Sequence, residues 1–591
     1  MKQINIMQAF AKMLPKMARV SPSFFALWMA TALVHGVVYG VIAPVTQYFL
    51  DKATAFSAQK IEVAAVVAAL LALGLAHVVK QALNGTANLM NTMYYRRAEG
   101  VLSVEVHQKM SRLTPICFED TRTLDDINKA IQGKNEAVWF TGSLLLMCTF
   151  YLPYFVIMAV YLFKLKPLLI ISLALVFMPV LLSQILRTKF FAEAEDASAP
   201  VRRALDYYES CMTEREYFKE TRVLGAFSYF KNLYTDALAL LNKVKFRASI
   251  KSDLARFGMQ MLSLGGHVGI FLLLLDALLK GDIGVGAFAA IFASIEQMVD
   301  LMNEWVCDNL GAVARDFGRV RNYFRFMQMP EREGADIDLP EDVGISLSGV
   351  SFSYPGAEQK AVDDVSLTIR HGETIALVGE NGSGKTTLVR LITGLYLPNE
   401  GDVLYGEANT KAIASPSLFR NISAVFQKYQ RYQMTLRENV GVSNVSDTAS
   451  DTALNKISVQ AGIDKSDDSF PDGYDTMLSR EFDGVDLSGG QWQRVAIARS
   501  FFRAHEFIVL DEPTAAIDPI EETRIYNRFA EISKDKTAVI VTHRLGSVKL
   551  ADRILVMKQG RLVEQGSHAE LIAVDGEYAR LYRSQEQWYR A

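Results

Sequence analysis

The sequence predicts an α-helical membrane domain of six transmembrane helices with long cytoplasmic extensions, followed by an α/β domain with a phosphate-binding loop. Three observations predict this fold class. Long apolar runs fill residues 22–315, whereas residues 340–591 have the composition of an ordinary soluble domain. A glycine-rich loop, GENGSGKTT, runs from Gly379 to Thr387. Short apolar strands alternate with helical segments around that loop, which is typical of a largely parallel sheet.

Averages over the 591 residues hide this division. Half of the residues are hydrophobic, the mean hydropathy is +0.13 and the formal net charge is −3. No basic excess indicates nucleic acid as a partner. Four cysteines have neither metal-ligand nor disulfide-framework spacing, so we interpret them as free thiols. They are Cys117, Cys148, Cys211 and Cys307.

The N-terminal segment is basic and precedes the first long apolar run. It contains Lys2, Lys12, Lys16 and Arg19 and no acidic residue. No small-residue cleavage site precedes the apolar run, so we do not predict a removable signal peptide. An amphipathic helix that lies on the inner surface of a membrane fits this segment better.

Six apolar stretches are long enough to cross a bilayer. They lie near residues 22–50, 62–92, 137–163, 166–187, 252–279 and 283–306. The connections between the second and third stretches and between the fourth and fifth are long and rich in Arg and Lys, whereas the connections at the other side are brief. Because basic loops stay on the cytoplasmic side, both termini are predicted to be cytoplasmic.

Residues 328–344 combine proline, glycine and acidic side chains without apolar periodicity, which indicates a linker. We therefore divide the chain into a membrane domain with the N-terminal interfacial helix, residues 1–327, this linker, and an α/β domain, residues 345–591. Within the last of these, the segments ISLSGVSFSY, TIALVG, FIVLD and TAVIVTH are predicted β-strands.

The glycine-rich loop satisfies the pattern G-x-x-x-x-G-K-[ST] between a strand and a helix, as a P-loop requires. Its glycines allow backbone N–H groups to surround phosphate oxygens, and the helix N-terminus adds a favourable dipole. Lys385 can reach the β- and γ-phosphates, and the Thr386 hydroxyl can bind Mg²⁺. The residues predicted to hold the nucleotide are Gly379, Glu380, Asn381, Gly382, Ser383, Gly384, Lys385, Thr386 and Thr387.

Two acidic residues follow the apolar segment FIVL. Asp511 ends the predicted strand, where a carboxylate can hold Mg²⁺ through water. Glu512 comes next and is positioned to polarise an attacking water as a general base. Alone, this pair could be a solvated strand end. After a phosphate loop, we predict a catalytic role.

The order of these motifs resembles the nucleotide-binding domain of ATP-binding cassette (ABC) proteins. The segment LSGGQWQRVAIARS, with Ser488, Gly489, Gly490 and Gln491, lies between the phosphate loop and FIVLDEPTAAID. In that family, LSGGQ completes the ATP site of a partner domain. The resemblance therefore implies ATP and Mg²⁺ as cofactors, and a second half-transporter as partner in a homodimer or a heterodimer.

Further roles are implied by this resemblance alone. Tyr354 matches the aromatic residue that stacks on adenine, and Gln427 matches the glutamine that senses Mg²⁺ and the γ-phosphate. His543 matches the switch histidine that positions the γ-phosphate, and Asp518 matches the D-loop aspartate. Taken singly, each of these residues also fits a structural role. The implied catalytic residues are Glu512, His543, Gln427 and Lys385, and the implied Mg²⁺ ligands are Thr386, Gln427 and Asp511.

The six spans before this domain are similar to the membrane half of exporter-type ABC transporters. The resemblance implies ATP-driven transport by a multi-pass protein of a bacterial inner membrane, with export of an amphipathic or cationic small molecule, peptide or lipid. Import of metal–siderophore complexes by the same architecture is the alternative. Short coupling helices are expected near Phe118–Ile127 and Tyr217–Phe227. One departure from the family pattern is SREFDGVD, which replaces a TEVGERG-like segment before the signature.

The sixth apolar stretch carries acidic residues at a spacing of four: Glu296, Asp300, Glu304 and Asp308. Successive members differ by about 40° around a helix, so they share one broad face. Glu296 lies roughly 20 Å into the stretch, where a carboxylate is costly and faces a cavity or a partner. We hypothesise that this acidic stripe lines the transport pathway and favours cationic cargo. Solvation or ion pairing is the alternative for Glu304 and Asp308.

Three histidines also fall within the apolar stretches, and we interpret them as packed or hydrogen-bonded residues. They are His35, His77 and His267.

Overall fold

The computed structural model describes residues 4–340, 342–445, 449–512, 519–543 and 547–590. The chain divides into two compact units, which we describe separately. The helical unit comprises Met1–Ser111 and Asp125–Met329, and the α/β unit comprises Arg112–Leu124 and Pro330–Ala591.

The helical unit is built from long helices, two of which contain a π-helical turn. Its elements are α1 (Ile6–Val20), α2 (Pro22–Ser57), α3 (Val63–Arg112), α4 (Thr121–Leu146), the π-turn η2 (Met147–Tyr151), α5 (Leu152–Leu165), α6 (Leu168–Thr213), α7 (Phe218–Val223), α8 (Phe227–Leu279), α9 (Val285–Asn303), the π-turn η3 (Glu304–Leu310) and α10 (Gly311–Met327). Six helical segments are long and apolar enough to cross a membrane, with a mean hydropathy of 1.5 to 2.5 in the most apolar window of each. The six predicted spans are confirmed.

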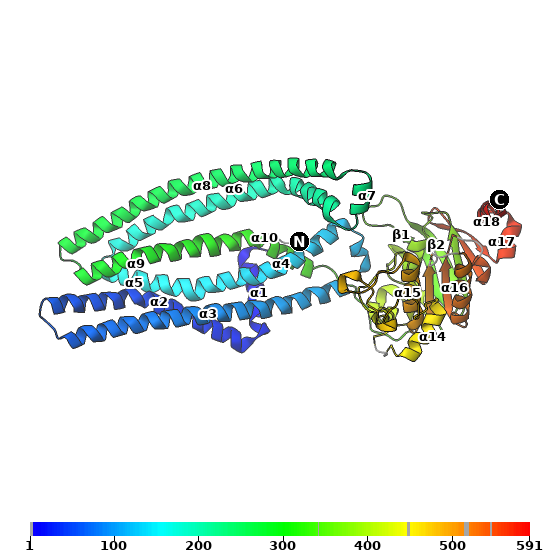
Figure 1. The fold of residues 1–591 in the computed structure, drawn as a ribbon, viewed down its shortest axis with the longest axis horizontal. Helices are drawn as coiled ribbons and strands as arrows, with labels where there is room; N and C mark the ends of the chain where they lie inside the picture. The colour runs from blue at the N-terminus through cyan, green and yellow to red at the C-terminus, as the bar shows by residue number, and fades with distance from the viewer. Residues whose placement is uncertain (1–3, 341, 446–448, 513–518, 544–546, 591) are drawn as a thin grey trace. The chain divides into compact units, whose positions relative to one another are not determined.

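These helices are much longer than a bilayer is thick. The 50 residues of α3 extend over about 75 Å, whereas a hydrocarbon core measures about 30 Å. Helices α6 and α8 lie side by side along most of their length (Figure 1). The predicted helical extensions beyond the membrane are therefore present, because few glycines and prolines interrupt the sequence of the long connections.

Helix α1 forms where an N-terminal amphipathic helix was predicted, but protein covers part of its apolar face. Ala9, Met13 and Met17 are buried, and the Tyr94 hydroxyl of α3 donates a hydrogen bond to the carbonyl of Met17. Lys16 pairs with Glu105, also on α3. The buried side of α1 thus packs on its own unit rather than on lipid.

The α/β unit contains two sheets. Its strands are β1 (Ile345–Phe352), β2 (Val362–Ile369), β3 (Thr374–Gly379), β4 (Glu400–Tyr405), β5 (Ala408–Asn409), β6 (Ile422–Val425), β7 (Phe507–Asp511), β8 (Thr537–Val541), β9 (Arg553–Lys558) and β10 (Arg561–Gly566). Four strands form an antiparallel sheet in the order β2-β1-β4-β5, and six form a second sheet in the order β10-β9-β3-β8-β7-β6. In the second sheet only the β9–β10 pair is antiparallel.

Helices pack around these sheets. They are α11 (Lys385–Ile392), α12 (Ser415–Arg420), α13 (Leu436–Gly441), α14 (Asp451–Ala461), α15 (Gly489–Phe502), α16 (Pro519–Ile532), α17 (His568–Val574) and α18 (Glu577–Arg590), with short 3₁₀ turns η1 (Pro115–Phe118), η4 (Thr410–Ala412), η5 (Gly473–Asp475), η6 (Arg480–Phe482) and η7 (Ser547–Leu550). Every residue of β7 and β8 is buried, as their unbroken apolar sequences predicted. The predicted α/β fold class is confirmed. The separate antiparallel sheet was not predicted from the sequence.

The segment Arg112–Leu124 connects two helices of the helical unit, yet it packs as part of the α/β unit. Ile116 contacts the apolar core beneath β1 and β2, and Leu113 forms a β-bridge with Glu331. The 3₁₀ turn Pro115–Phe118 lies a few residues before the predicted coupling helix, because α4 already begins at Thr121. Helix α7 falls within the second predicted coupling segment.

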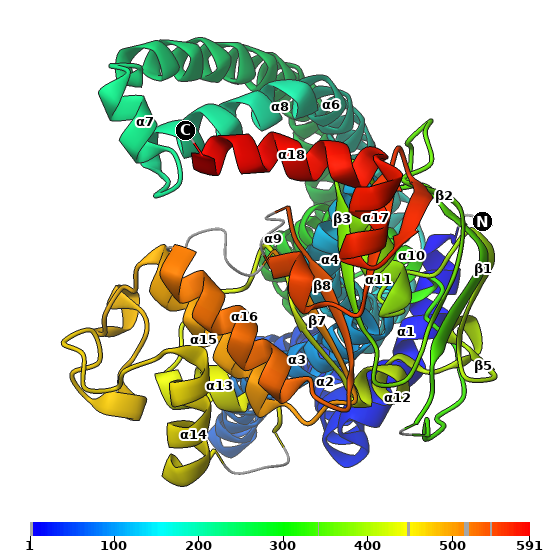
Figure 2. The same ribbon diagram turned by 90° about the vertical axis from the view of Figure 1, so that its right-hand side faces the viewer.

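The strand order brings the ends of three motif-bearing strands together. Strands β3, β8 and β7 are parallel neighbours, so their carboxyl ends meet at one edge of the sheet (Figure 2). The phosphate loop follows β3, Glu512 follows β7, and His543 follows β8. Ligands of open parallel sheets bind at this edge.

Candidate nucleotide-binding site

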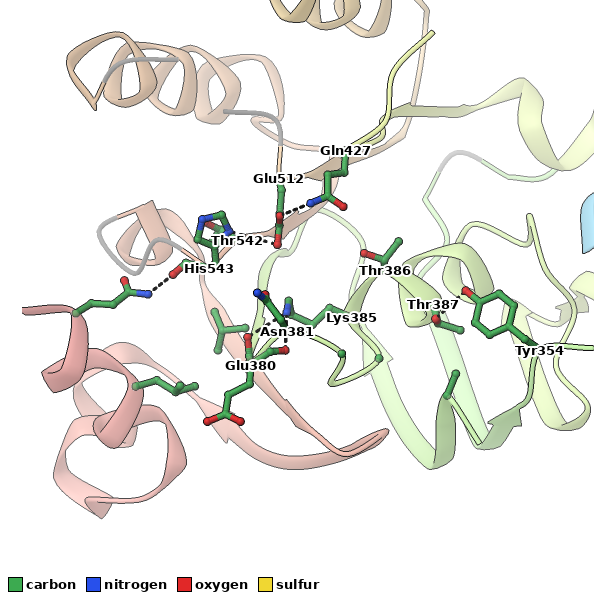
Figure 3. A pocket seen from close by; sticks show the side chains of 17 residues that line it. Tyr354, Glu380, Asn381, Lys385, Thr386, Thr387, Gln427, Glu512, Thr542 and His543 are labelled. Atoms are coloured by element: carbon green, nitrogen blue, oxygen red, sulfur yellow. Dashed lines mark hydrogen bonds and ion pairs between the residues drawn. The ribbon is translucent and has the colours of Figure 1, made fainter. Parts of the chain in front are cut away.

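A cavity of about 720 Å³ lies at the carboxyl edge of the six-stranded sheet (Figure 3). Its lining includes eight of the nine predicted phosphate-loop residues, namely Gly379, Glu380, Asn381, Gly382, Gly384, Lys385, Thr386 and Thr387. Tyr354, Gln427, Glu512 and His543 line it too. The structure thus brings together predicted site residues that are up to 189 positions apart, from Tyr354 to His543.

The phosphate loop adopts a conformation that requires glycine. Gly384 has φ +101°, and a Cβ atom there would lie 2.3 Å from the carbonyl oxygen of Ala361. This residue is the N-cap of α11, so the N-terminus of that helix opens into the cavity. An anion at this position would meet unpaired backbone N–H groups and the positive end of the helix dipole.

Lys385 is buried and held by its own loop. Its Nζ donates hydrogen bonds to the carbonyl oxygens of Gly379 and Glu380, each at 3.0 Å. Burial lowers the pKa of its ammonium group, an effect that the nearby carboxylates of Glu512 and Asp511 oppose. A phosphate in the cavity would supply the negative charge that these carbonyl dipoles only partly provide.

Asp511 is buried behind Thr386, whose hydroxyl donates to Asp511 Oδ1 at 3.3 Å. The other carboxyl oxygen, Oδ2, is buried with no hydrogen-bond partner among the described residues. Burial raises the pKa of Asp511 to about 6. Proteins hold Mg²⁺ with one or two carboxylates, together with phosphates and water. The unpaired carboxyl oxygen of Asp511 and the neighbouring threonine hydroxyl are therefore suitable ligands. Thr386 and Asp511 therefore fit Mg²⁺.

Glu512 lies between two of the side chains implied by the family resemblance. Gln427 Nε2 donates to Glu512 Oε2 at 2.7 Å, and His543 Nδ1 is 3.3 Å from Glu512 Oε1 (Figure 3). Glu512 also has φ +49°, a left-handed conformation that costs a non-glycine residue about 1–3 kcal/mol. Such strain persists where the surrounding structure imposes it, and here it points the carboxylate into the cavity.

Two cavity residues from the last helix were missed by the sequence analysis. Leu581 and Gln585 of α18 line the cavity, and the Gln585 amide donates to the carbonyl of His543. Gln585 therefore helps to hold the backbone that carries His543. No motif marks these residues, because their position depends on how α18 packs against the rest of the unit.

Tyr354 belongs to a hydrogen-bonded network that reaches the segment Arg112–Leu124. Its hydroxyl lies 3.0 Å from Thr387 Oγ1 and accepts from Arg390 at 3.2 Å. Arg390 also donates to Glu119 at 3.1 Å and to the hydroxyl of Tyr396 at 2.9 Å. The Tyr396 hydroxyl in turn donates to Glu119. Hydrogen bonds thus connect Glu119 with the phosphate loop through Arg390 and Tyr354.

The signature residues Ser488 to Gln491 are not among the residues that line this cavity. They form the N-terminus of α15, where Ser488 is the N-cap. The Ser488 N–H donates to Gln491 Oε1 at 2.9 Å, and the Gln491 N–H donates to Ser488 Oγ at 3.3 Å. Gln491 also donates to Ser469 at 2.7 Å. The signature is therefore a preformed helix N-terminus, with Ser488 and Gly489 exposed at the surface.

Two predicted residues have other positions. Ser383 does not line the cavity, and its buried hydroxyl has no partner among the described residues. Asp518 lies outside the described residues.

In the helical unit, Glu296, Asp300 and Glu304 are exposed, and no ion pair holds them within the described part of the chain. The side chain of Asp308 is outside the described set.

The site and its sheet are those of a P-loop nucleotide-binding domain. Comparisons with known proteins indicate which family of such domains this one resembles. Residues 362–515 match the family described as ABC transporter. The subtilin transport ATP-binding protein SpaT of Bacillus subtilis is 32% identical over 386 residues, which is 64% of this chain and 62% of that protein. The nisin transport ATP-binding protein NisT of Lactococcus lactis is 36% identical over 41% of this chain and 40% of its own length. The ATP-dependent lipid A-core flippase of Dechloromonas aromatica is 31% identical over 62% of this chain and 63% of its own length.

A solved structure extends the likeness to nearly the whole chain. The structure of a bacterial Atm1-family ABC exporter with ATP bound has a TM-score of 0.82, covers 95% of this chain and 99% of its own, and is 20% identical in sequence. This similarity shows a common fold. Residues 362–515 thus match the ABC transporter family, and the whole chain, with a six-helix membrane unit and an α/β unit, has the fold of that exporter. The chain spans about three fifths of the length of the first curated relative.

Proposed function

We propose that this protein hydrolyses ATP at the cavity around Glu512 and uses it to move a cargo across a bacterial inner membrane, with both termini in the cytoplasm. The observation that carries the proposal is the position of Glu512, which two side chains from other segments hold at the cavity. Its carboxylate accepts a hydrogen bond from Gln427 and lies beside His543. A water on the phosphate side of Glu512 would lose a proton to this carboxylate as it attacks the γ-phosphate.

The other residues of the cavity would bind and orient the nucleotide. Lys385 and the N-terminus of α11 would contact the phosphates, and the ring of Tyr354 would stack on adenine. Mg²⁺, held by Thr386 and Asp511 with Gln427 nearby, would neutralise charge on the β- and γ-phosphates. When a phosphate replaces the carbonyl partners of Lys385, the lysine gains a full negative charge to pair with, which strengthens binding.

We propose a dimer because the signature residues lie outside the cavity of their own chain. The exposed N-terminus of α15 would then complete the nucleotide site of another α/β unit. The chain carries both a full set of P-loop, Glu512 and His543 residues and a full signature, so two copies would form two competent sites. A second half-transporter of different sequence would serve equally as the partner.

We propose export as the direction of transport and an amphipathic cationic compound as the class of cargo. The exposed carboxylates of Glu296 and Asp300 on α9 support this cargo, since a membrane-embedded acid without an ion pair faces a cavity or a partner. In inside-out vesicles, the double variant Glu296→Gln/Asp300→Asn should transport a cationic dye more slowly than the parent chain. Undiminished dye transport would remove the acidic stripe from the pathway.

The test of ATP hydrolysis is the variant Glu512→Gln in the full chain reconstituted in lipid. Loss of the general base should lower the turnover of ATP by about 10²–10⁴-fold while ATP binding is retained. The matched control is Glu481→Gln, which alters an exposed acid elsewhere in the same unit. Normal turnover by Glu512→Gln would refute the role of this residue.

A further inference from the structure

A second cavity, of about 200 Å³, lies within the helical unit. It is lined by α2, α3, the π-turn η2 with the end of α4, and the junction of α9 with η3. We call it the amide cavity and define it by His35, Tyr39, Asn84, Asn88, Phe150 and Glu304. The lining is more polar than that of a packed core between membrane helices, where such groups are costly and mark functional sites.

One wall of the amide cavity is a row of side-chain amides on α3. Gln81, Asn84, Asn88 and Asn91 line the cavity at spacings of three, four and three, which place them on a single face of the helix. Asn88 Nδ2 donates to Asn84 Oδ1 at 3.2 Å, which leaves the Asn84 amide donors and the Asn88 carbonyl for other partners. A carboxamide both donates and accepts, so this row matches a ligand that does the same.

The facing wall is aromatic. The rings of His35 and Phe150 are 4.7 Å apart, and Tyr39 meets both of them edge-on at 5.6 Å. The Lys80 ammonium lies 4.6 Å from the centre of the Tyr39 ring. These rings offer an apolar surface beside the amide row, which is the combination that an amphipathic ligand requires.

His35 is the observation that most directly indicates a ligand. The side chain is only 5% exposed, and its Nε2 atom has no hydrogen-bond partner among the described residues. A buried polar atom left unpaired costs about 1–3 kcal/mol, and native structures rarely leave one without a reason. His35 is one of the residues that line the amide cavity, and we take its unpaired nitrogen as the atom that a bound group would satisfy.

The cavity depends on features that ordinary helix packing does not require. Gly36 lets α2 approach η2 closely, since a Cβ atom there would lie 2.4 Å from the carbonyl oxygen of Phe150. The helices that carry Phe150 and Glu304 both contain a π-turn, η2 and η3. Asn309 of η3 donates to the Tyr151 hydroxyl of η2 at 3.2 Å, which joins the two turns. Such π-turns occur frequently at functional sites.

We propose that the amide cavity binds a short stretch of an amphipathic, cationic peptide as the cargo of this protein. The amide row would pair with backbone amides of the peptide, His35 Nε2 would complete one further hydrogen bond, and the aromatic wall would contact an apolar side chain. Glu304 would pair with a basic side chain. The volume suits one or two residues, so the rest of the peptide would lie outside the cavity. This inference rests on the proposed transport function and names its cargo class.

The test measures equilibrium binding of tritiated N-acetyl-Leu-Lys-Leu-amide to the full chain in lipid nanodiscs without ATP. The double variant Asn84→Ala/Asn88→Ala should bind the peptide at least tenfold more weakly. Thr86→Ala is the matched control on α3, since its hydroxyl donates to Ala82 within the helix, and it should change binding less than twofold. His35→Phe keeps the ring and removes the unpaired nitrogen, and should weaken binding several-fold.

A second peptide tests the role of Glu304. Replacement of the peptide lysine by norleucine should weaken binding to the parent chain, whereas Glu304→Gln should bind both peptides alike. Unchanged peptide affinity in the asparagine variant, or a lysine preference retained by Glu304→Gln, would overturn the inference. Displacement of the peptide by phosphatidylethanolamine would assign the cavity to lipid and overturn it too. ATP turnover is measured in parallel, so loss of hydrolysis with intact peptide binding would count against the proposed function alone.

Discussion

The nucleotide site and the amide cavity are built in opposite ways. In the α/β unit, the phosphate loop, Glu512 and His543 each follow a buried strand, and the order of parallel strands brings them together. In the helical unit, the amide cavity is lined by side chains of several helices, which lie between Trp28 and Glu304 in the sequence. A site made largely by backbone and strand order has a readable motif. A site made by side chains on packed helices has none.

The largest expected effect is a loss of ATP affinity without a loss of peptide binding. Lys385→Ala removes the buried ammonium group of the phosphate loop, and loss of a charge-assisted hydrogen bond costs about 1.5–3 kcal/mol. ATP affinity should therefore fall on the order of 10- to 100-fold, while binding of the tripeptide to the helical unit stays the same. Equilibrium titration with a fluorescent ATP analogue and with the tritiated peptide measures both.

Lys411→Ala is the control for this variant, because Lys411 pairs with Asp402 at the surface of the same unit. It should leave ATP affinity within twofold of the parent. An equal loss of ATP affinity in both variants would show that general charge, rather than the phosphate loop, determines binding.

A smaller effect tests whether the amide cavity depends on close helix packing. Gly36→Ala places a methyl group against the backbone of Phe150, so we expect a loss of about 1–3 kcal/mol in the free energy of unfolding of the helical unit. Gly74→Ala, on α3, meets open space and should not lower this free energy, which helix propensity would raise by up to about 1 kcal/mol. Thermal unfolding in detergent compares the two. Equal stability of Gly36→Ala and the parent would contradict the packing that we describe.

The smallest effect concerns the network from Glu119 to Tyr354. Glu119 is 41% exposed at its side chain, and exposed pairs contribute about 0–1 kcal/mol, so Glu119→Gln should change the KM for ATP only about two- to threefold. Tyr354→Phe keeps the ring and removes the hydroxyl that Arg390 contacts. Because Arg390 joins both residues, the two effects should not add in the double variant. Strict additivity of the two KM changes would show that Glu119 and the nucleotide site are independent.

Much of the fold follows from sequence patterns. The six apolar stretches and the strands TIALVG and FIVLD match elements of the structure because long apolar runs and buried parallel strands are dictated by local composition. The antiparallel sheet of β1, β2, β4 and β5 was not predicted in full, because its partners are set by long-range pairing. The apolar face of α1 was expected on lipid, yet part of it, around Met13 and Met17, is buried within the helical unit.

The candidate sites differ in the same way. The phosphate loop carries its own pattern, and the proposed roles of Gln427 and His543 came from the family resemblance. Gln585 reaches the His543 carbonyl only because of the packing of α18, so no local signal marks it. His35 was interpreted as a packed residue, and it does pack against Phe150, but its Nε2 has no hydrogen-bond partner among the described residues. Sequence spacing along one helix does not contain that information.

The most direct test of the account is ATP-dependent accumulation of the tritiated tripeptide in inside-out vesicles that contain the full chain. We expect accumulation with the parent chain and ATP, and none with Glu512→Gln, although that variant still binds both ATP and the peptide. Equal accumulation by the parent and Glu512→Gln, or accumulation without ATP, would contradict the claim that hydrolysis at Glu512 drives the export of this cargo.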